Sequence, residues 1–266
     1  MAEAALRGDY SRAGPDYAVE QDWSSYTDAE HALYRRLFER QAKLVPRYAC
    51  PEWQDAIAGL EGVSEKIPHF GKLSEKLRRA TGWEIVPVPG LIPDEAFFTH
   101  LAGRRFPVTV WLRKPEEFDY IVEPDVFHDF FGHVPLLFDR TYADHLYEYG
   151  KGGLKAMRLG AVTMLARLYW YTIEFGLTKT SSGVKAYGAG LLSSGGELAY
   201  CVDDARPQRR PFDLERIMRT EYRIDRYQDT YFVIDSFEHL MRETAPDFTP
   251  IYARLKTLPA FRPDEE

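Results

Sequence analysis

At residues 123–135 the chain reads EPDVFHDFFGHVP, and two of its seven histidines lie in this stretch. Asp125 is a good helix N-cap and Gly132 a good helix stop, so the stretch predicts a helix of two turns or less. His128 would lie in its first turns and His133 just past its end. Five steps along an ideal α-helix rotate a side chain by roughly 140°. We therefore expect the two histidines to converge only because the helix ends between them.

The composition is that of an ordinary globular protein with an acidic balance. Hydrophobic residues make up 45% of the 266 positions and charged residues 28%, which suits one large domain or two small ones. The net charge of −7 argues against non-specific nucleic-acid binding. Aromatic residues are abundant at 14%.

Nothing in the sequence predicts export or membrane insertion. No apolar leader follows Met1. The most apolar long segment, residues 160–177, contains Arg167 and Glu174 and is therefore expected to be a buried helix. Cys50 and Cys201 provide neither metal-ligand spacing nor a disulfide framework. We expect a cytoplasmic protein with no membrane and no nucleic-acid partner.

Helix caps, apolar periodicity and chain breakers predict a single, mainly helical (α+β) domain with a small β portion. We expect a flexible arm over residues 1–20, the folded domain over residues 21–261 and a polar tail over residues 262–266. Glycine-rich residues 150–153 are expected to form a connection. The expected helices cover residues 27–44, 50–60, 70–82, 91–101, 126–131, 154–177, 212–219 and 236–243, and the expected strands lie within residues 83–90, 106–113 and 231–234.

One stripe of the long apolar helix carries Thr163, Arg167, Trp170 and Glu174, at helical spacing. A carboxylate inside an apolar helix is costly unless it is paired or bound to a metal ion. Three explanations are open for Glu174: a metal site, an internal link to Arg167, or a position at a solvated edge.

Taken together, His128, His133 and Glu174 would form a two-histidine, one-carboxylate metal site of the kind found in non-haem iron oxygenases. Two neutral imidazoles and one carboxylate, with no thiol, suit divalent iron, manganese or zinc and leave one face of the metal open. A zinc hydrolase would normally add a general base in a motif such as HExxH, which is absent. The alternative is that both histidines are half-buried structural residues in an aromatic cluster. The aromatic residues expected to form a flat, apolar pocket around the set are Phe127, Phe130, Phe131, Trp170 and Phe175.

Three motifs carry a resemblance to a known family. They are EPDxxHxxxGHxPL at residues 123–136, YWxTxEFGL at residues 169–177 and YGAGLLSS at residues 187–194. All three closely resemble the pterin-dependent aromatic amino acid hydroxylases, and among these the chain looks like the short bacterial phenylalanine 4-monooxygenases. The resemblance extends from near Trp23 to about Pro259.

The resemblance implies a fold, a reaction and cofactors. The fold is a single basket-like catalytic domain around the metal. The cofactors are Fe(II) and tetrahydrobiopterin or another tetrahydropterin, and O2 is the co-substrate. The reaction is hydroxylation of L-phenylalanine to L-tyrosine through a ferryl-oxo intermediate. The animal relatives' regulatory domain and tetramer helix are not expected, so the protein is predicted to be a monomer.

The resemblance also implies roles for individual residues. The implied iron ligands are His128, His133 and Glu174. The implied pterin contacts are a stack on Phe97, the backbone of Gly90, Leu91 and Ile92, and the side chains of Asp129 and Tyr169. The implied substrate contacts are Arg113, held by Asp125 and gripping the carboxylate, with Trp170 and Phe175 beside the ring and Ser193 fixing the tautomer of an iron histidine.

The chain departs from the family pattern at two positions. Asp129 stands where Glu is usual, so a shorter side chain would reach the pterin less well. Gly195 stands where an aromatic residue is common, so looser packing above the site is expected. Both departures concern cofactor affinity and not the reaction.

Three competing functions stay open on the sequence alone. The first is phenylalanine hydroxylation, and tryptophan or tyrosine hydroxylation is its nearest rival. An aliphatic residue at Ile224, next to Asp225, favours phenylalanine because tyrosine hydroxylases carry Asp in this segment. A catalytically silent amino-acid or pterin binding protein is the third, and the intact ligand set argues against it.

Overall fold

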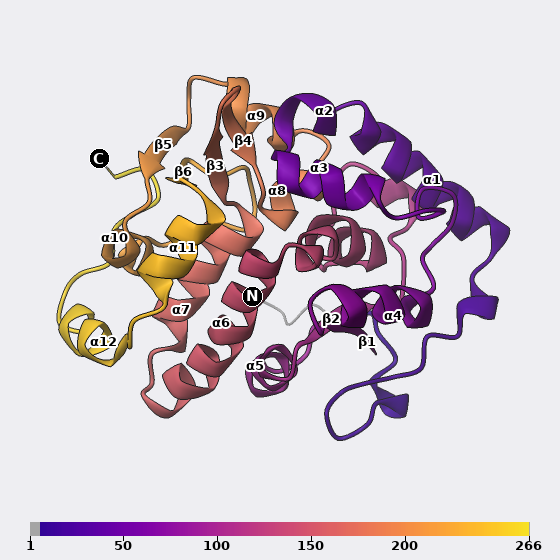
Figure 1. Cartoon of the computed structure of the whole chain (residues 1–266), viewed down its shortest axis with the longest axis horizontal. Helices are drawn as coiled ribbons and strands as arrows, with labels where there is room; N and C mark the ends of the chain where they lie inside the picture. The colour runs from indigo at the N-terminus through magenta and orange to yellow at the C-terminus, as the bar shows by residue number, and fades with distance from the viewer. Residues whose placement is uncertain (1–5, 266) are drawn as a thin grey trace.

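Helices make up most of the computed structural model, which describes residues 6–265, and two small sheets lie on opposite sides of it (Figure 1). This confirms the expected mainly helical class. The α-helices are α1 (Asp28–Ala42), α2 (Val45–Tyr48), α3 (Pro51–Ala58), α4 (Phe70–Ala80), α5 (Asp94–Ala102), α6 (Arg140–Arg158), α7 (Val162–Tyr169), α8 (Ala189–Ser193), α9 (Glu197–Asp203), α10 (Leu214–Arg219), α11 (Phe237–Thr244) and α12 (Thr249–Leu255). Short 3-10 helices are η1 (Tyr10–Arg12), η2 (Trp23–Ser25), η3 (Pro115–Glu117) and η5 (Pro135–Phe138), and π-helices are η4 (His128–His133) and η6 (Trp170–Glu174).

The first sheet is a parallel pair, β1 (Glu84–Val88) and β2 (Arg105–Thr109), joined through α5. The carboxyl ends of parallel strands meet at one edge, so the loop after β1 lies beside the chain leaving β2. Two hydrogen bonds hold them together: Val110 N donates to Val88 O, and Trp111 Nε1 donates to Pro89 O over 2.9 Å.

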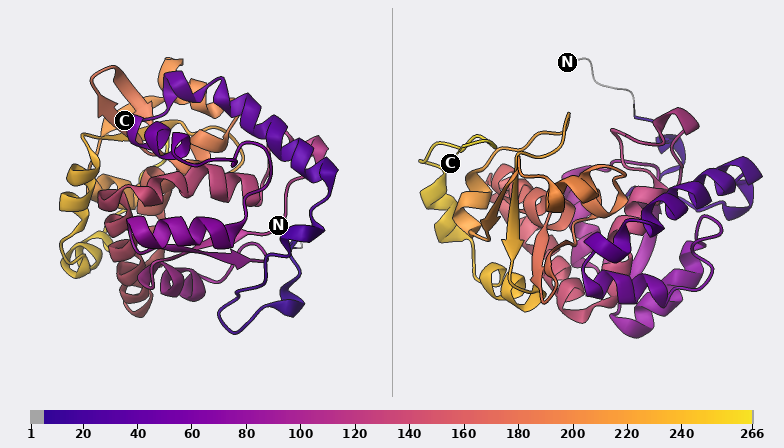
Figure 2. Two further views of the ribbon diagram at one scale, coloured as in Figure 1. Left: turned by 45° about the vertical axis from the view of Figure 1, so that its right-hand side comes forward. Right: turned by 90° about the horizontal axis from the view of Figure 1, so that it is seen from above.

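The second sheet has four strands in the order β4-β3-β6-β5, formed by β3 (Leu177–Thr180), β4 (Gly183–Ala186), β5 (Gln208–Pro211) and β6 (Thr230–Ile234). Strand β6 is parallel to both its neighbours, and β3 and β4 form an antiparallel hairpin. Seen from above, this sheet and α1 lie on opposite sides of the molecule (Figure 2). Helix η4 lies in the interior, where it contacts α8 and β2.

The face of η4 away from the metal-ligand side is anchored in an aromatic core. Phe127 and Phe131 are fully buried and stacked, with ring centroids 4.9 Å apart. Trp53 of α3 packs on Phe131 and donates its indole N–H to the Phe131 carbonyl. Burial of each such ring stabilises the fold by about 1.5–3 kcal/mol. Phe127 and Phe131 therefore serve the core, and the expectation that they line the pocket is wrong.

Residues 150–153, expected to be a connection, lie inside α6. The reason is tertiary packing. A Cβ atom at Gly150 would come within 2.5 Å of the Ala102 backbone, and one at Gly153 would lie 2.1 Å from the Phe98 ring. Both glycines therefore allow α5 to pack closely against α6, which outweighs their low helix propensity.

The long helix expected over residues 154–177 is divided. Helix α6 ends at Arg158, α7 begins at Val162, and η6 continues α7 up to Glu174. The expected helices at residues 27–44, 50–60, 70–82 and 236–243 are confirmed as α1, α3, α4 and α11. Strands β3, β4 and β5 were not predicted, and α12 lies where only a proline-broken segment was expected.

Residues 6–20, in the expected arm, contact β1, the loop after it and the segment after β2. Val19 N donates to Pro87 O, and Tyr10 OH donates to Leu91 O over 2.8 Å. Arg7 pairs with Glu117. Residues 1–5 of the arm and residue 266 of the expected polar tail lie outside the described residues. The division into arm, domain and tail stays a prediction.

Within residues 6–265, no helix combines the length and the apolar composition that a membrane span requires. Both cysteines, Cys50 and Cys201, are buried free thiols.

Glu197, at the start of α9, is a buried carboxylate with a stability consequence. Its Oε1 accepts hydrogen bonds from Gln228 N over 2.8 Å and from Tyr231 OH over 2.7 Å. Burial raises the pKa of Glu197 from 4.5 to about 7, although these two bonds lower it. From about pH 4.5 to 7 the folded state therefore holds a proton that the unfolded chain has lost, so this group makes stability fall as the pH rises.

We expect Glu197→Gln to remove this pH dependence, because a neutral amide oxygen accepts the same two hydrogen bonds. The free energy of unfolding of the variant should exceed that of wild type by on the order of 2–3 kcal/mol at pH 8. The gain should shrink steadily as the pH falls from 7 to 5, toward the lower end of the window set by the two pKa values. Urea unfolding from pH 5 to 8 measures it, and a difference that does not vary with pH would contradict the assignment.

Candidate iron and substrate site

The two histidines of the central stretch lie inside one helix, and the expectation that the helix ends between them is wrong. Helix η4 is π-helical from His128 to His133. A π-helical turn bonds residue i to residue i+5, so side chains five apart lie on one side, which an ideal α-helix would not allow. The two imidazole centroids are 5.3 Å apart.

A second π-helical turn brings the carboxylate of Glu174 to them. Phe175 N donates to Trp170 O at the end of η6, an i to i+5 bond. Glu174 Oε1 lies 3.1 Å from His133 Nε2, and its Oε2 lies 3.6 Å from His128 Nε2. One ligand atom from each of the three residues lies within 4.8 Å of the others, which makes this a candidate metal-binding triad.

The protonation states suit a metal site. Burial lowers the pKa of His128, which favours the neutral imidazole with a free lone pair. Burial raises the pKa of Glu174, but His133, His128 and a hydrogen bond from Tyr169 together outweigh it, so the net shift is downward and the group is a carboxylate. Two neutral nitrogens and one carboxylate oxygen are the donors that non-haem Fe(II) takes, so the residues present fit the iron that the sequence motifs imply.

The alternative of an internal Arg167–Glu174 link is wrong. Arg167 donates instead to the carbonyls of Met218 and Arg219. Its position on the same helical stripe does not bring it to the carboxylate, because the helix changes from α to π between them.

Ser193 sets the tautomer of His128. The Ser193 hydroxyl donates its single hydrogen to Ala189 O over 2.8 Å. It must therefore accept from His128 Nδ1, which lies 2.9 Å away. The proton is then on Nδ1, and the lone pair of Nε2 points toward Glu174.

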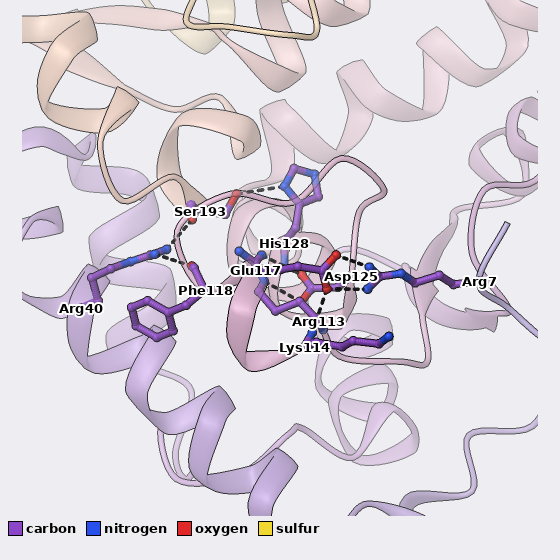
Figure 3. A network of polar contacts seen from close by, with 9 residues as sticks. All are labelled: Arg7, Arg40, Arg113, Lys114, Glu117, Phe118, Asp125, His128 and Ser193. Carbon is purple, nitrogen blue, oxygen red and sulfur yellow. Dashed lines mark hydrogen bonds and ion pairs between the residues drawn. The ribbon is translucent and has the colours of Figure 1, made fainter. Parts of the chain in front are cut away.

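The position of Ser193 depends in turn on α1. Arg40 donates to the carbonyls of Phe118 and Ser193, as Figure 3 shows. The fully buried Gln41 donates to the carbonyls on either side of Ser193. The Arg40 guanidinium also fills the space beside Gly195, where a Cβ atom would meet it at 3.0 Å. The space beside Gly195, where we expected looser packing, is therefore occupied by the Arg40 side chain.

Arg113 and Asp125 form a buried, two-pronged ion pair beside η4 (Figure 3). Arg113 Nε donates to Asp125 Oδ2 over 2.8 Å and Nη2 donates to Oδ1 over 2.9 Å. Asp125 also accepts from the backbone N–H of His128 and of Arg113, so it is both helix cap and guanidinium holder. Burial alone would raise the pKa of Asp125, but Arg113 and the two N–H groups lower it on balance. Among the described residues, Nη1 of Arg113 has no hydrogen-bond partner.

Trp170 and Phe175 flank Glu174 and form an aromatic wall. Their ring centroids are 4.6 Å apart. Tyr222 also stacks on the Trp170 indole, with ring centroids 4.2 Å apart and an angle of 13° between the ring planes. The indole N–H donates to Gln228 Oε1 over 3.0 Å.

The residues implied for the pterin lie along a line of aromatic rings. Phe97 contacts Tyr169 at 5.7 Å, and Tyr169 contacts His133 at 6.4 Å between centroids. Asp129 accepts from Thr109 N over 2.8 Å, and burial raises its pKa.

The loop after β1 carries the other residues implied for the pterin. At Gly90 the backbone φ is +150°, and a Cβ would meet Glu123 Oε1 at 2.7 Å, so this position requires glycine. Leu91 is half exposed and partly exposed Ile92 follows it.

Sequence reasoning missed three supporting side chains: Arg40, Gln41 and Gln228. A signal existed for Gln41, which continues the apolar stripe of Leu33 and Leu37 at i+4 spacing. A polar amide in such a stripe indicates a buried hydrogen-bonding role. Gln228 lies in an irregular segment, where no periodicity distinguishes it.

The comparisons with known proteins agree with this geometry. Residues 15–254 match the family described as biopterin-dependent aromatic amino acid hydroxylase. The phenylalanine-4-hydroxylase of Ralstonia nicotianae is 57% identical over 247 residues, which cover 93% of this chain and 79% of the relative. That of Chromobacterium violaceum is 57% identical over 240 residues, covering 90% and 81%. An iron- and phenylalanine-bound crystal structure of the Chromobacterium violaceum enzyme has a TM-score of 0.91 and 53% identity, and the match covers 98% of this chain and 94% of that chain. On its sequence, its fold and its candidate triad, the chain belongs to the family of biopterin-dependent aromatic amino acid hydroxylases.

Proposed function

We propose that this protein is a phenylalanine 4-monooxygenase that converts L-phenylalanine to L-tyrosine with O2 and a tetrahydropterin. The observation that carries the proposal is the convergence of His128, His133 and Glu174 within 4.8 Å, beside a buried Arg113. These three residues would hold Fe(II). Bound iron and pterin together supply the chemistry that splits dioxygen, one atom of which enters the substrate ring.

The protein's own residues bind and orient the amino acid. Arg113 would take the substrate carboxylate on its Nη1 side, since Asp125 occupies its other edge. Trp170 and Phe175 would wall the substrate ring and exclude water from it. Ser193 would keep Nε2 of His128 free for the metal.

The pterin would lie between the loop after β1 and the aromatic line that leads to the triad. Phe97 would stack on its ring, and the backbone of Gly90, Leu91 and Ile92 would offer hydrogen bonds. Tyr169 separates Phe97 from His133 and would contact the pterin edge. Asp129 would contact the pterin from η4, and its short side chain would limit how far it reaches.

Phenylalanine is favoured over the two other aromatic amino acids. The relatives at 57% identity are phenylalanine-4-hydroxylases. Ile224 lies in the segment after α10, and its carbonyl accepts from Tyr120 OH over 2.8 Å. The carboxylate of the adjacent Asp225 is paired with Arg223, so Ile224 lies as an uncharged residue between the two members of an ion pair.

The test is incubation with Fe(II), a tetrahydropterin and each aromatic amino acid in turn, with products identified by chromatography. We expect tyrosine from phenylalanine at a rate at least tenfold above product formation from tryptophan or tyrosine. Samples treated with a chelator provide the control. Binding of phenylalanine without any product would favour a silent binding protein, and preferred tryptophan turnover would reassign the substrate.

We further propose a monomeric state, because no heptad pattern is visible in the sequence. Light scattering of the purified protein should give a mass near 30.7 kDa at all concentrations tested. A stable dimer or tetramer would contradict this prediction.

The proposed location is the cytoplasm. Cys50 and Cys201 are buried thiols on separate elements, and neither takes part in a disulfide. Such cysteines are compatible with a reducing compartment. The proposed partners are confined to small molecules, phenylalanine and the pterin.

A further inference from the structure

Gln228 connects the aromatic wall to the irregular segment at residues 221–227. It is 2% exposed. Its side-chain Oε1 accepts from Trp170 Nε1 over 3.0 Å, and its Nε2 donates to Arg223 O over 2.8 Å. Its backbone N–H donates to Glu197. The orientation of the amide follows from its partners, because an indole N–H can only donate and a carbonyl can only accept.

The segment at residues 221–227 contains no helix or strand and forms the outer side of the wall. Tyr222 stacks on Trp170, and Tyr171 OH donates to Glu221 O over 2.6 Å. Ile224 is 62% exposed. The backbone of the segment is tied at the start by Glu221 N, which donates to Phe261 O over 2.9 Å. Further along, its carbonyls accept from the side chains of Tyr120 and Gln228, and Gln228 is the one of these two that also contacts the indole.

Stacking alone does not fix where the indole lies within its own plane. The rings of Phe175 and Tyr222 pack on the Trp170 indole and restrain the tilt of its plane. Ring stacking tolerates sliding and rotation within that plane. A hydrogen bond to the indole N–H is directional and removes this rotation.

We propose that Gln228 is a positioning residue, which fixes the Trp170 indole and the segment at residues 221–227 as one unit and so sets where the substrate ring lies. The proposal rests on the proposed function. A ring held loosely beside the metal would let the pterin be oxidised without matching hydroxylation, since placement within about an ångström decides whether the ring reacts.

The experiment compares Gln228→Met with wild type. Methionine keeps the length of the side chain and loses the hydrogen bonds to Trp170 Nε1 and to the carbonyls of Arg223 and Arg226. We expect the ratio of tyrosine formed to pterin oxidised to fall at least threefold and the KM for phenylalanine to rise at least threefold. The rate of pterin oxidation should stay within twofold of wild type. Gln54→Met is the matched control, because it removes the hydrogen bond that the amide of Gln54, on α3, donates to the Ala49 carbonyl, and it should leave the ratio unchanged.

A double-mutant cycle with Trp170→Phe separates positioning from a general structural role. The side chain of phenylalanine carries no N–H group, so in the Trp170→Phe background Gln228 has no ring hydrogen bond through which to act. If the indole bond matters, adding Gln228→Met to Trp170→Phe should change the ratio less than twofold. Thermal unfolding of every variant identifies any loss of fold.

Two outcomes would overturn the inference. One is an unchanged ratio and KM in Gln228→Met, with or without a lower melting temperature, which would make Gln228 purely structural. The other is an effect of the same size in the Trp170→Phe background. Failure of the proposed function gives a different result, because wild type itself would then form no tyrosine from phenylalanine. If another aromatic amino acid is the substrate, the same ratio is measured with it.

Discussion

His133→Ala is expected to abolish hydroxylation and to weaken iron binding by more than about 100-fold, because changing even an outer partner of a metal ligand costs about 10–100-fold. Only His128 and Glu174 of the triad would then remain as donors. The fold should survive, since a single buried substitution typically costs about 0.5–3 kcal/mol. Iron content after anaerobic loading and desalting measures the loss, and circular dichroism checks the fold.

His239→Ala is the matched control for this prediction. His239 is a partly buried histidine on α11, where its Nδ1 accepts from Asp235 N, and it is not part of the triad. Its removal should leave iron content and activity at the wild-type level. Wild-type iron content in His133→Ala would remove His133 from the proposed site, and an unfolded protein would require His133→Gln in its place.

The helices that the sequence predicts correctly are those whose signals are local. The capping box of Thr27 and Glu30 forms as expected at the start of α1, and Ser236 caps α11. The errors arise where distant packing decides the structure. Gly150 and Gly153 signal a break, but their missing side chains are what allow α5 to approach α6.

The π-helical turns explain why the site could be predicted only in part. The identity of the triad follows from the resemblance of three motifs, but a periodicity of 3.6 residues places His128 and His133 on different faces. A π-helical turn lies in a helix without a composition signal of its own. The supporting contacts are even harder to predict from the sequence, because they join distant residues. Arg40 and Ser193 are 153 residues apart, and Trp170 and Gln228 are 58 apart.

Arg113→Lys is expected to raise the KM for phenylalanine at least tenfold, with iron content unchanged. Arg113 presents a planar fork, of which two nitrogens bind Asp125 and the third is available for a carboxylate. Lysine keeps the charge but cannot bind Asp125 with two bonds and a substrate with another in a fixed geometry. A loss of roughly 1.4 kcal/mol in substrate binding corresponds to the tenfold change. Steady-state kinetics with phenylalanine varied at saturating pterin provide the measurement.

The same variant should also oxidise pterin in excess of the tyrosine formed, because an amino acid without a fixed carboxylate leaves its ring poorly placed. Arg105→Lys, at a half-exposed pair with Asp16, is the control and should change neither quantity.

Asp125→Asn separates the two roles of Asp125, as helix cap and as the partner of the Arg113 guanidinium. Asparagine is as good an N-cap as aspartate, so η4 should form, whereas the neutral amide no longer holds the guanidinium by charge, and the KM should still rise. A normal KM and full coupling in Arg113→Lys would mean that another group holds the substrate carboxylate, and a normal KM in Asp125→Asn would mean that Arg113 is held in place without the charge of its partner.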